Sequence, residues 1–99
     1  MDLYEHYTEL QSLTQHLNHL RIKEPYKSDM MVEFKIVPND DVDDYIFIKQ
    51  TEWLKELINE DEHFRKYKVE YHTRRRQLNI DVCHPKINEY RQRQLGRLR

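Results

Sequence analysis

The amino-acid sequence predicts an α+β domain of two layers, in which antiparallel β-hairpins form a sheet and helices pack on it, in the order α-β-β-α-β-β-α. Three observations predict this class. The first twenty residues repeat leucine at helical spacing, two later segments alternate apolar and polar residues, and residues 69–82 have the pattern of two strands around a basic turn. The length of 99 residues favours a single domain over residues 1–99.

The first element is predicted to be a helix that begins at Leu3, with Asp2 as its cap, and continues to Leu20. It ends before Pro25, because a proline ring disfavours helical geometry in the preceding residue. The helix packs on the sheet or on its counterpart in a homodimer. Its apolar residues recur at steps of three and four and form one stripe: Leu3, Tyr7, Leu10, Leu13, Leu17 and Leu20.

A first hairpin is predicted from residues 31–37 and 45–49, which both alternate apolar and polar side chains. The register that places Glu33 opposite Lys49 also puts the large apolar side chains of both segments on one face. Residues 38–44 then form an acidic loop. A second helix is predicted to follow over residues 51–67, capped by Thr51 and interrupted by the acidic residues 59–62.

A second hairpin is predicted over residues 69–82, around a four-residue loop of residues 74–77. A slip of one residue would mix its two faces, so the alternation favours one register. That register pairs Thr73 with Leu78, Tyr71 with Ile80 and Val69 with Val82. A final basic helix is predicted over residues 85–99, with Pro85 in its first turn. Because it is weakly amphipathic, we expect it to fray or to stay partly disordered until a partner binds.

The register of the second hairpin creates an electrostatic conflict on its other face, where Glu70 lies opposite Asp81 with His72 and Asn79 beside them. Like charges directly opposite each other destabilise a strand pair. Three explanations remain open: the face is well solvated, the register is wrong, or a cation or an arginine lies between the carboxylates. A small metal-dependent nuclease site at this position is the third of the functions that the sequence suggests.

Charge is unevenly distributed along the chain, although the net charge is only −1. Residues 1–62 hold 15 acidic and 6 basic residues, a net of −9, and residues 63–99 hold 3 acidic and 11 basic residues, a net of +8. This asymmetry predicts two separate outward-facing regions that bind something else. The alternative is that the two halves neutralise each other within the domain or across a homodimer.

The basic region predicts contact with nucleic acid, or with a protein that already holds nucleic acid, because a guanidinium donates two parallel hydrogen bonds to a phosphate. The protein is therefore predicted to be a small regulator or adaptor and not an enzyme. An acidic protein surface as partner, or a solvated turn with no partner, is the alternative. The predicted contact residues are Arg74, Arg75, Arg76, Arg91, Arg93, Arg97 and Arg99.

The acidic loop suggests a second function, that of a protein inhibitor. Its acidic N-terminal half would dock on the basic groove of a host enzyme that handles nucleic acid, in imitation of the nucleic acid. The residues that would carry this contact are Asp40, Asp41, Asp43 and Asp44.

No cofactor and no metal is predicted, because the single glycine leaves no phosphate loop and no cysteine or histidine has zinc-like spacing. Cys83 is the only cysteine, which excludes an intrachain disulfide and fits a reducing compartment. The chain has no signal-like start and no long apolar run, so a soluble cytoplasmic protein without membrane contact is expected. The absence of alanine suggests AT-rich coding sequence, as in a phage or another mobile element.

Overall fold

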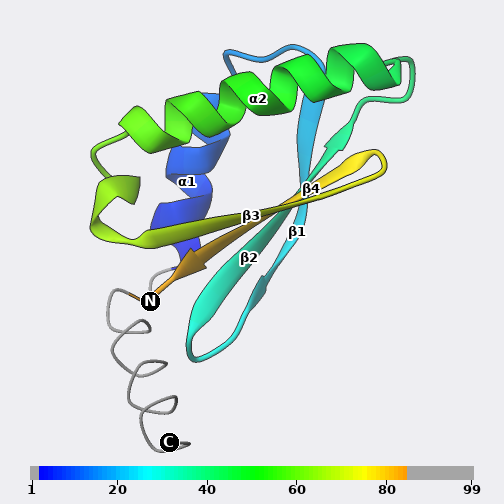
Figure 1. Ribbon diagram of the computed structural model, residues 1–99. Helices are drawn as coiled ribbons and strands as arrows, with labels where there is room; N and C mark the ends of the chain where they lie inside the picture. Colours follow the sequence, from blue (N-terminus) through cyan, green and yellow to red (C-terminus); the bar gives the residue numbers. More distant parts are fainter. Residues whose placement is uncertain (1–2, 85–99) are drawn as a thin grey trace, which may run out of the picture.

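The computed structural model describes residues 3–84 as a helical layer packed on one antiparallel sheet (Figure 1). The predicted α+β class and the order α-β-β-α-β-β are confirmed for these residues, while the basic helix predicted over residues 85–99 lies outside them. The elements are α1 (Leu3–Thr14), β1 (Leu20–Lys27), β2 (Met31–Pro38), α2 (Asp44–Glu60), the short 3₁₀ helix η1 (Phe64–Lys66), β3 (Lys68–Arg74) and β4 (Gln77–Cys83).

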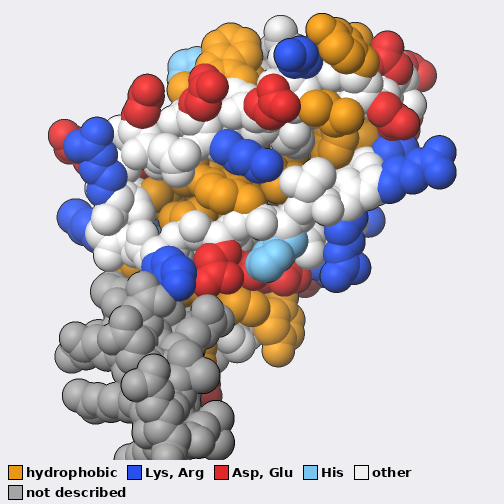
Figure 2. Space-filling view, in the orientation of Figure 1, with side chains coloured by type: hydrophobic (Ala, Val, Ile, Leu, Met, Phe, Trp, Pro, Cys, Tyr) orange, Lys and Arg blue, Asp and Glu red, His pale blue; other side chains and the backbone are white. Residues whose placement is uncertain are grey.

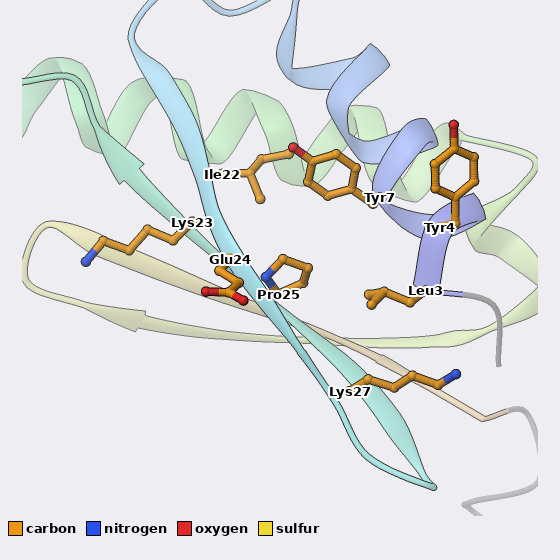
Figure 3. Close-up of a pocket in the computed structure, with 8 residues that line it drawn as sticks. All are labelled: Leu3, Tyr4, Tyr7, Ile22, Lys23, Glu24, Pro25 and Lys27. Carbon is orange, nitrogen blue, oxygen red and sulfur yellow. The ribbon is translucent and has the colours of Figure 1, made fainter.

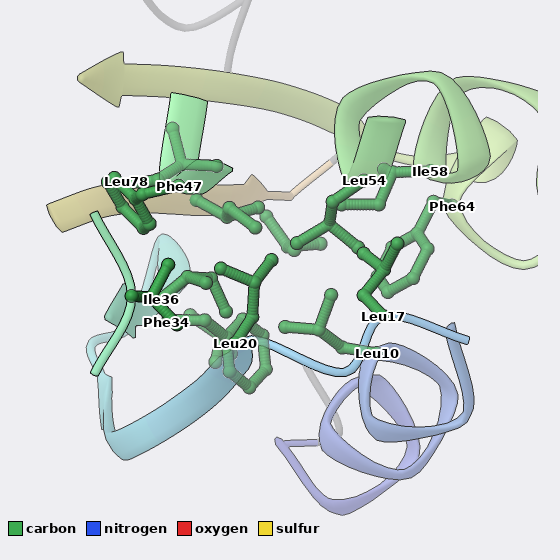
Figure 4. Packing of buried hydrophobic residues seen from close by; sticks show 14 residues of the cluster. Leu10, Leu17, Leu20, Phe34, Ile36, Phe47, Leu54, Ile58, Phe64 and Leu78 are labelled. Atoms are coloured by element: carbon green, nitrogen blue, oxygen red, sulfur yellow. The ribbon is translucent and has the colours of Figure 1, made fainter. Parts of the chain in front are cut away.

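The sheet has the strand order β1-β2-β4-β3, so two hairpins lie side by side and β2 pairs with β4 at the centre. Figure 1 shows α1 and α2 on the same side of a strongly twisted sheet. The core lies between these layers and is formed by apolar side chains from both helices and from the inner face of every strand (Figure 4). Its central members are Leu10, Leu17, Phe34, Ile36, Phe47, Leu54, Ile58, Leu78 and Ile80.

The prediction that the first helix continues to Leu20 is wrong, because α1 ends at Thr14 and residues 20–27 form β1. The amides of His16 and Leu17 bond to carbonyls three residues back, which tightens and closes the last turn. Leu17 and Leu20 are nevertheless buried in the core, Leu17 from the turn after α1 and Leu20 from the first residue of β1. Pro25 sits in β1 at a shift in register, on an edge strand, where its missing N–H costs no ladder bond.

The predicted pairing of residues 31–37 with residues 45–49 is also wrong. Residues 45–49 lie in α2, and β2 pairs instead with β1 on one side and with β4 on the other. The helix begins earlier than predicted because Asp43, not Thr51, is its N-cap: the Asp43 carboxylate accepts the Ile46 amide at 2.8 Å. Thr51 is buried in mid-helix, where its hydroxyl donates to the Ile48 carbonyl.

The second hairpin has the predicted register, including Glu70 opposite Asp81 and Thr73 opposite Leu78. The turn is shorter than expected, because Arg74 pairs with Gln77 and only two arginines remain between the strands. The second of these, Arg76, has a φ of 56°, in the left-handed region that few residues other than glycine adopt.

Candidate nucleic-acid interface

The sheet has an inner face that carries the helices and an outer face whose side chains alternate with those of the core. In the residues that the structure describes, both helices pack on the inner face. The strand registers fix the rows in which outer-face side chains lie across the sheet. One such row is basic and polar, with Lys23 opposite Lys35 and then Asn79 and His72 on β4 and β3.

The outer face is basic at the end where the β3–β4 turn lies. Lys23 and Lys35 face each other there, and Arg21 is one row nearer the turn, opposite Val37. Arg74 closes β3 at this same end, followed by Arg75 in the turn. Figure 2 shows Lys and Arg side chains gathered at the hairpin end. We call Arg21, Lys23, Lys35, Arg74 and Arg75 the basic end.

Arg76 has a different role from its two neighbours. Its Nη1 lies 2.6 Å from Asp44 Oδ1, and its Nη2 donates to the Val42 carbonyl at 2.8 Å. These two bonds fasten the hairpin turn to the start of α2. Arg74 and Arg75 are exposed, and neither forms an ion pair with any carboxylate of residues 3–84.

The acidic loop therefore lies against the arginine turn. Asp44 is paired with Arg76 and Asp43 caps α2, so two of the four predicted acidic contact residues have structural roles. Asp40 and Asp41 are exposed in the turn before α2. The expectation of two separate charged regions is wrong at this point, because Arg76 and Asp44 join them. The C-terminal arginines predicted as contacts, Arg91, Arg93, Arg97 and Arg99, lie outside the described residues.

An acidic row crosses the outer face next to the basic end. Glu33 and Glu70 lie opposite Asp81 from its two sides. The imidazole Nε2 of His72 is 3.2 Å from Asp81 Oδ2 and 3.9 Å from Glu70 Oε2. Burial and the negative charge of Glu33 raise the pKa of Asp81 above its ordinary value, and His72 acts in the opposite direction. The negative charge of this row would repel a polyanion, whereas the positive charge of the basic end would attract one.

A separate hollow of about 670 Å³ lies between α1 and β1 (Figure 3). Leu3, Tyr7, Ile22 and Pro25 give it an apolar lining, and Lys23 and Lys27 lie at its margin. Tyr4 and Glu24 complete the lining, so polar as well as apolar groups border the hollow.

No protein-family model, no curated protein and no solved structure matches this chain. Among the residues that the structure describes, neither helix combines the length and the apolar composition needed to cross a lipid bilayer.

Sequence reasoning missed three members of the basic end, Arg21, Lys23 and Lys35. Two of them lie in β1, which was not predicted: the leucine stripe assigns Leu20 to a helix, and the first predicted strand begins at residue 31. The signal that was available is the alternation of Leu20, Arg21, Ile22 and Lys23, which is typical of a half-buried strand.

Proposed function

We propose that this protein is a small non-enzymatic regulator or adaptor that contacts nucleic acid, or a protein already holding nucleic acid, through the basic end of its sheet. The observation that carries the proposal is that Arg74 and Arg75 have no carboxylate partner within residues 3–84 and lie at the same end of the sheet as Arg21, Lys23 and Lys35. The proposal keeps Arg91, Arg93, Arg97 and Arg99 as further contacts, on the strength of their charge in the sequence alone. We place the protein in the cytoplasm and infer a phage or other mobile element as its origin.

The dimensions of the basic end suit a nucleic-acid backbone. Neighbouring strands lie about 4.8 Å apart, so its charges extend over roughly 14 Å from β1 to β3. A guanidinium at the turn donates a planar fork of hydrogen bonds to a phosphate, and the lysines add charge without fixed direction. The bonds from Arg76 to Asp44 and Val42 hold the turn in place, which lowers the entropy lost by Arg74 and Arg75 on binding.

Fluorescence anisotropy with labelled duplex DNA, single-stranded DNA and RNA tests the proposal. Five phosphate contacts predict a slope of about −4.5 in log K against log salt on a duplex. The double variant Arg74→Ala/Arg75→Ala should make that slope shallower by about 1.8. The matched control is Arg65→Ala/Lys66→Ala, which removes two exposed charges from η1, at the opposite end of β3 from the turn.

Two results would overturn the proposal. One is the absence of binding to all three probes even at about 50 mM salt, where phosphate contacts are strong. The other is an equal loss of affinity in the hairpin and η1 double variants, which would show that only net charge matters.

We keep the inhibitor as a second candidate because acidic side chains line the outer surface of α2 (Figure 2). Glu52, Glu56 and Glu60 are exposed there, close in sequence to the exposed aromatic side chains of Tyr45 and Trp53. A basic groove of an enzyme that handles nucleic acid is the matching partner, and charged and aromatic groups together suit such a contact.

A pull-down from host extract separates this candidate from the first. The variant Asp40→Asn/Asp41→Asn removes exposed charges and leaves the α2 cap and the Arg76 ion pair intact. The inhibitor hypothesis predicts that this variant loses the captured enzyme, and that nuclease treatment of the beads does not release it from the wild type. Unchanged capture by the variant would exclude the acidic loop as the contact.

A further inference from the structure

Three potential metal ligands converge on the outer face, from neighbouring strands. Glu70 and His72 are on β3, two residues apart and so on one face, and Asp81 is opposite Glu70 on β4. One ligand atom from each lies within 4.8 Å of the other two. The shortest separation is 3.2 Å, from His72 Nε2 to Asp81 Oδ2.

Asp81 supplies an independent sign that the cluster is incomplete. Its side chain is only 9% exposed, yet its Oδ1 receives no hydrogen bond within the described residues. The strand partners that face it directly are two other acids, Glu33 and Glu70. A buried carboxylate normally has a hydrogen-bond donor or a cation beside it, which compensates for the hydration lost on burial.

The donor set and its spacing suit a transition metal. Metal–ligand bonds of 2.0–2.2 Å in a tetrahedral site put the ligand atoms about 3.4 Å apart. The separations of 3.2 Å and 3.9 Å from His72 Nε2 bracket that value, and the Glu70 and Asp81 oxygens lie within 4.8 Å of each other, so side-chain rotations would close the site. One imidazole with two carboxylates favours Mn²⁺ or Zn²⁺, whereas Mg²⁺ and Ca²⁺ prefer oxygen ligands alone.

We propose that Glu70, His72 and Asp81 bind one divalent first-row transition metal ion on the outer face. The ligands come from two strands and meet through the predicted register of β3 with β4, at the position where the sequence suggested a cation between the carboxylates. The ion would neutralise the repulsion between Glu70 and Asp81 and would leave coordination positions open to water on the solvent side, where His72 is 54% exposed.

Isothermal titration calorimetry of the whole chain with MnCl₂, ZnCl₂ and MgCl₂ tests this, with loss of the free Mn²⁺ electron-paramagnetic-resonance signal as a second readout. Wild type should bind one equivalent of Mn²⁺ or Zn²⁺. His72→Gln and Asp81→Asn should each weaken binding by more than about 100-fold, beyond what the loss of an outer-shell group causes. The matched control is His16→Gln, which removes an exposed histidine from the turn after α1.

Several outcomes would overturn the proposal. The first is no binding at about 1 mM metal, a concentration at which even weak extracellular calcium sites are occupied. The second is equal weakening of metal binding by His72→Gln and His16→Gln. The third is binding of Mg²⁺ that His72→Gln leaves unchanged. Circular dichroism and the melting temperature of each metal-free variant establish that it is folded. His72→Gln provides a test that does not depend on Asp81→Asn, because His72 is largely exposed.

Discussion

The acidic row on the outer face predicts that Asp81→Asn stabilises the metal-free protein. Asp81 is buried between two like charges, Glu33 and Glu70, each directly opposite it on a neighbouring strand. Asparagine has nearly the same shape and no charge, and its amide can donate to a neighbouring carboxylate. The substitution therefore removes repulsion without opening a cavity.

The size of the effect follows from the number of contacts. Cross-strand charge pairs are worth about 0.2–1 kcal/mol each, so the removal of two repulsive pairs gains about 1.2 kcal/mol. The same substitution loses the contact between Asp81 and the half-exposed His72, which lowers the free energy of unfolding by about 0.5 kcal/mol. The net gain of about 0.7 kcal/mol corresponds to a melting temperature higher by about 4 °C for a domain of this size.

The gain should depend on pH in a defined direction. Because the folded state raises the pKa of Asp81 above its ordinary value of 3.8, the folded protein binds this proton more tightly than the unfolded chain does. Protonation of Asp81 at low pH therefore stabilises the folded wild type relative to its unfolded chain. This stabilisation is lost as the pH rises through the raised pKa of Asp81. The advantage of Asp81→Asn should be full at pH 7 and should disappear as the pH falls to about 3.8.

Urea denaturation in EDTA, followed by circular dichroism, measures this for the wild type, Asp81→Asn and the control Asp41→Asn. Asp41 is exposed, so its substitution should change the free energy of unfolding by less than about 0.5 kcal/mol at either pH. If Asp81→Asn is less stable than the wild type at pH 7, or if its advantage is the same at pH 4, repulsion within the acidic row is not the governing effect.

Three further predictions concern the fold. Arg76→Ala should lower the free energy of unfolding by about 1–2 kcal/mol, because it loses the bonds to Asp44 and Val42. Arg76→Gly loses the same bonds but should cost about 1 kcal/mol less, because glycine accepts the positive φ without strain. Equal urea midpoints for the two variants would contradict this. Asp43→Ala should lower it by about 1 kcal/mol through loss of the α2 cap, whereas Asp43→Ser should restore most of it. Leu54→Ala, at a site that is 0% exposed, should lower it by about 2–5 kcal/mol, and a smaller loss would mean that α2 packs loosely on the sheet.

The second hairpin was predictable because the features that determine its register lie within the hairpin itself. Alternation in residues 69–82 admits one register, and basic residues at its centre mark the turn. The first hairpin was not, because residues 45–49 are too short and too apolar for alternation to distinguish strand from helix. The decisive features are the Asp43 cap and the pairing of β2 with β4, which joins segments more than forty residues apart in sequence.

The candidate interface, too, is only partly predictable from the sequence. Three adjacent arginines at a turn are visible in the sequence. Which of them is paired within the fold and which two are exposed depends on Asp44, which is 32 residues from Arg76. Arg21 and Lys35 join the interface only through the strand register. A sequence pattern identifies the charged residues, and the sheet determines which of them act together.

The arrangement of charge on the outer face restricts how a polyanion would bind. A strand of nucleic acid that ran parallel to the β-strands would pass from the basic end onto Glu33, Asp81 and Glu70, so the favourable path crosses the strands near the turn. A metal ion bound by the acidic row would reduce that repulsion and present a positive charge beside Lys35 and His72. Binding of metal and of nucleic acid would then favour each other by the same factor, as linkage requires. Anisotropy titrations with and without Mn²⁺ measure that factor, and in Asp81→Asn the metal should have no effect on nucleic-acid affinity.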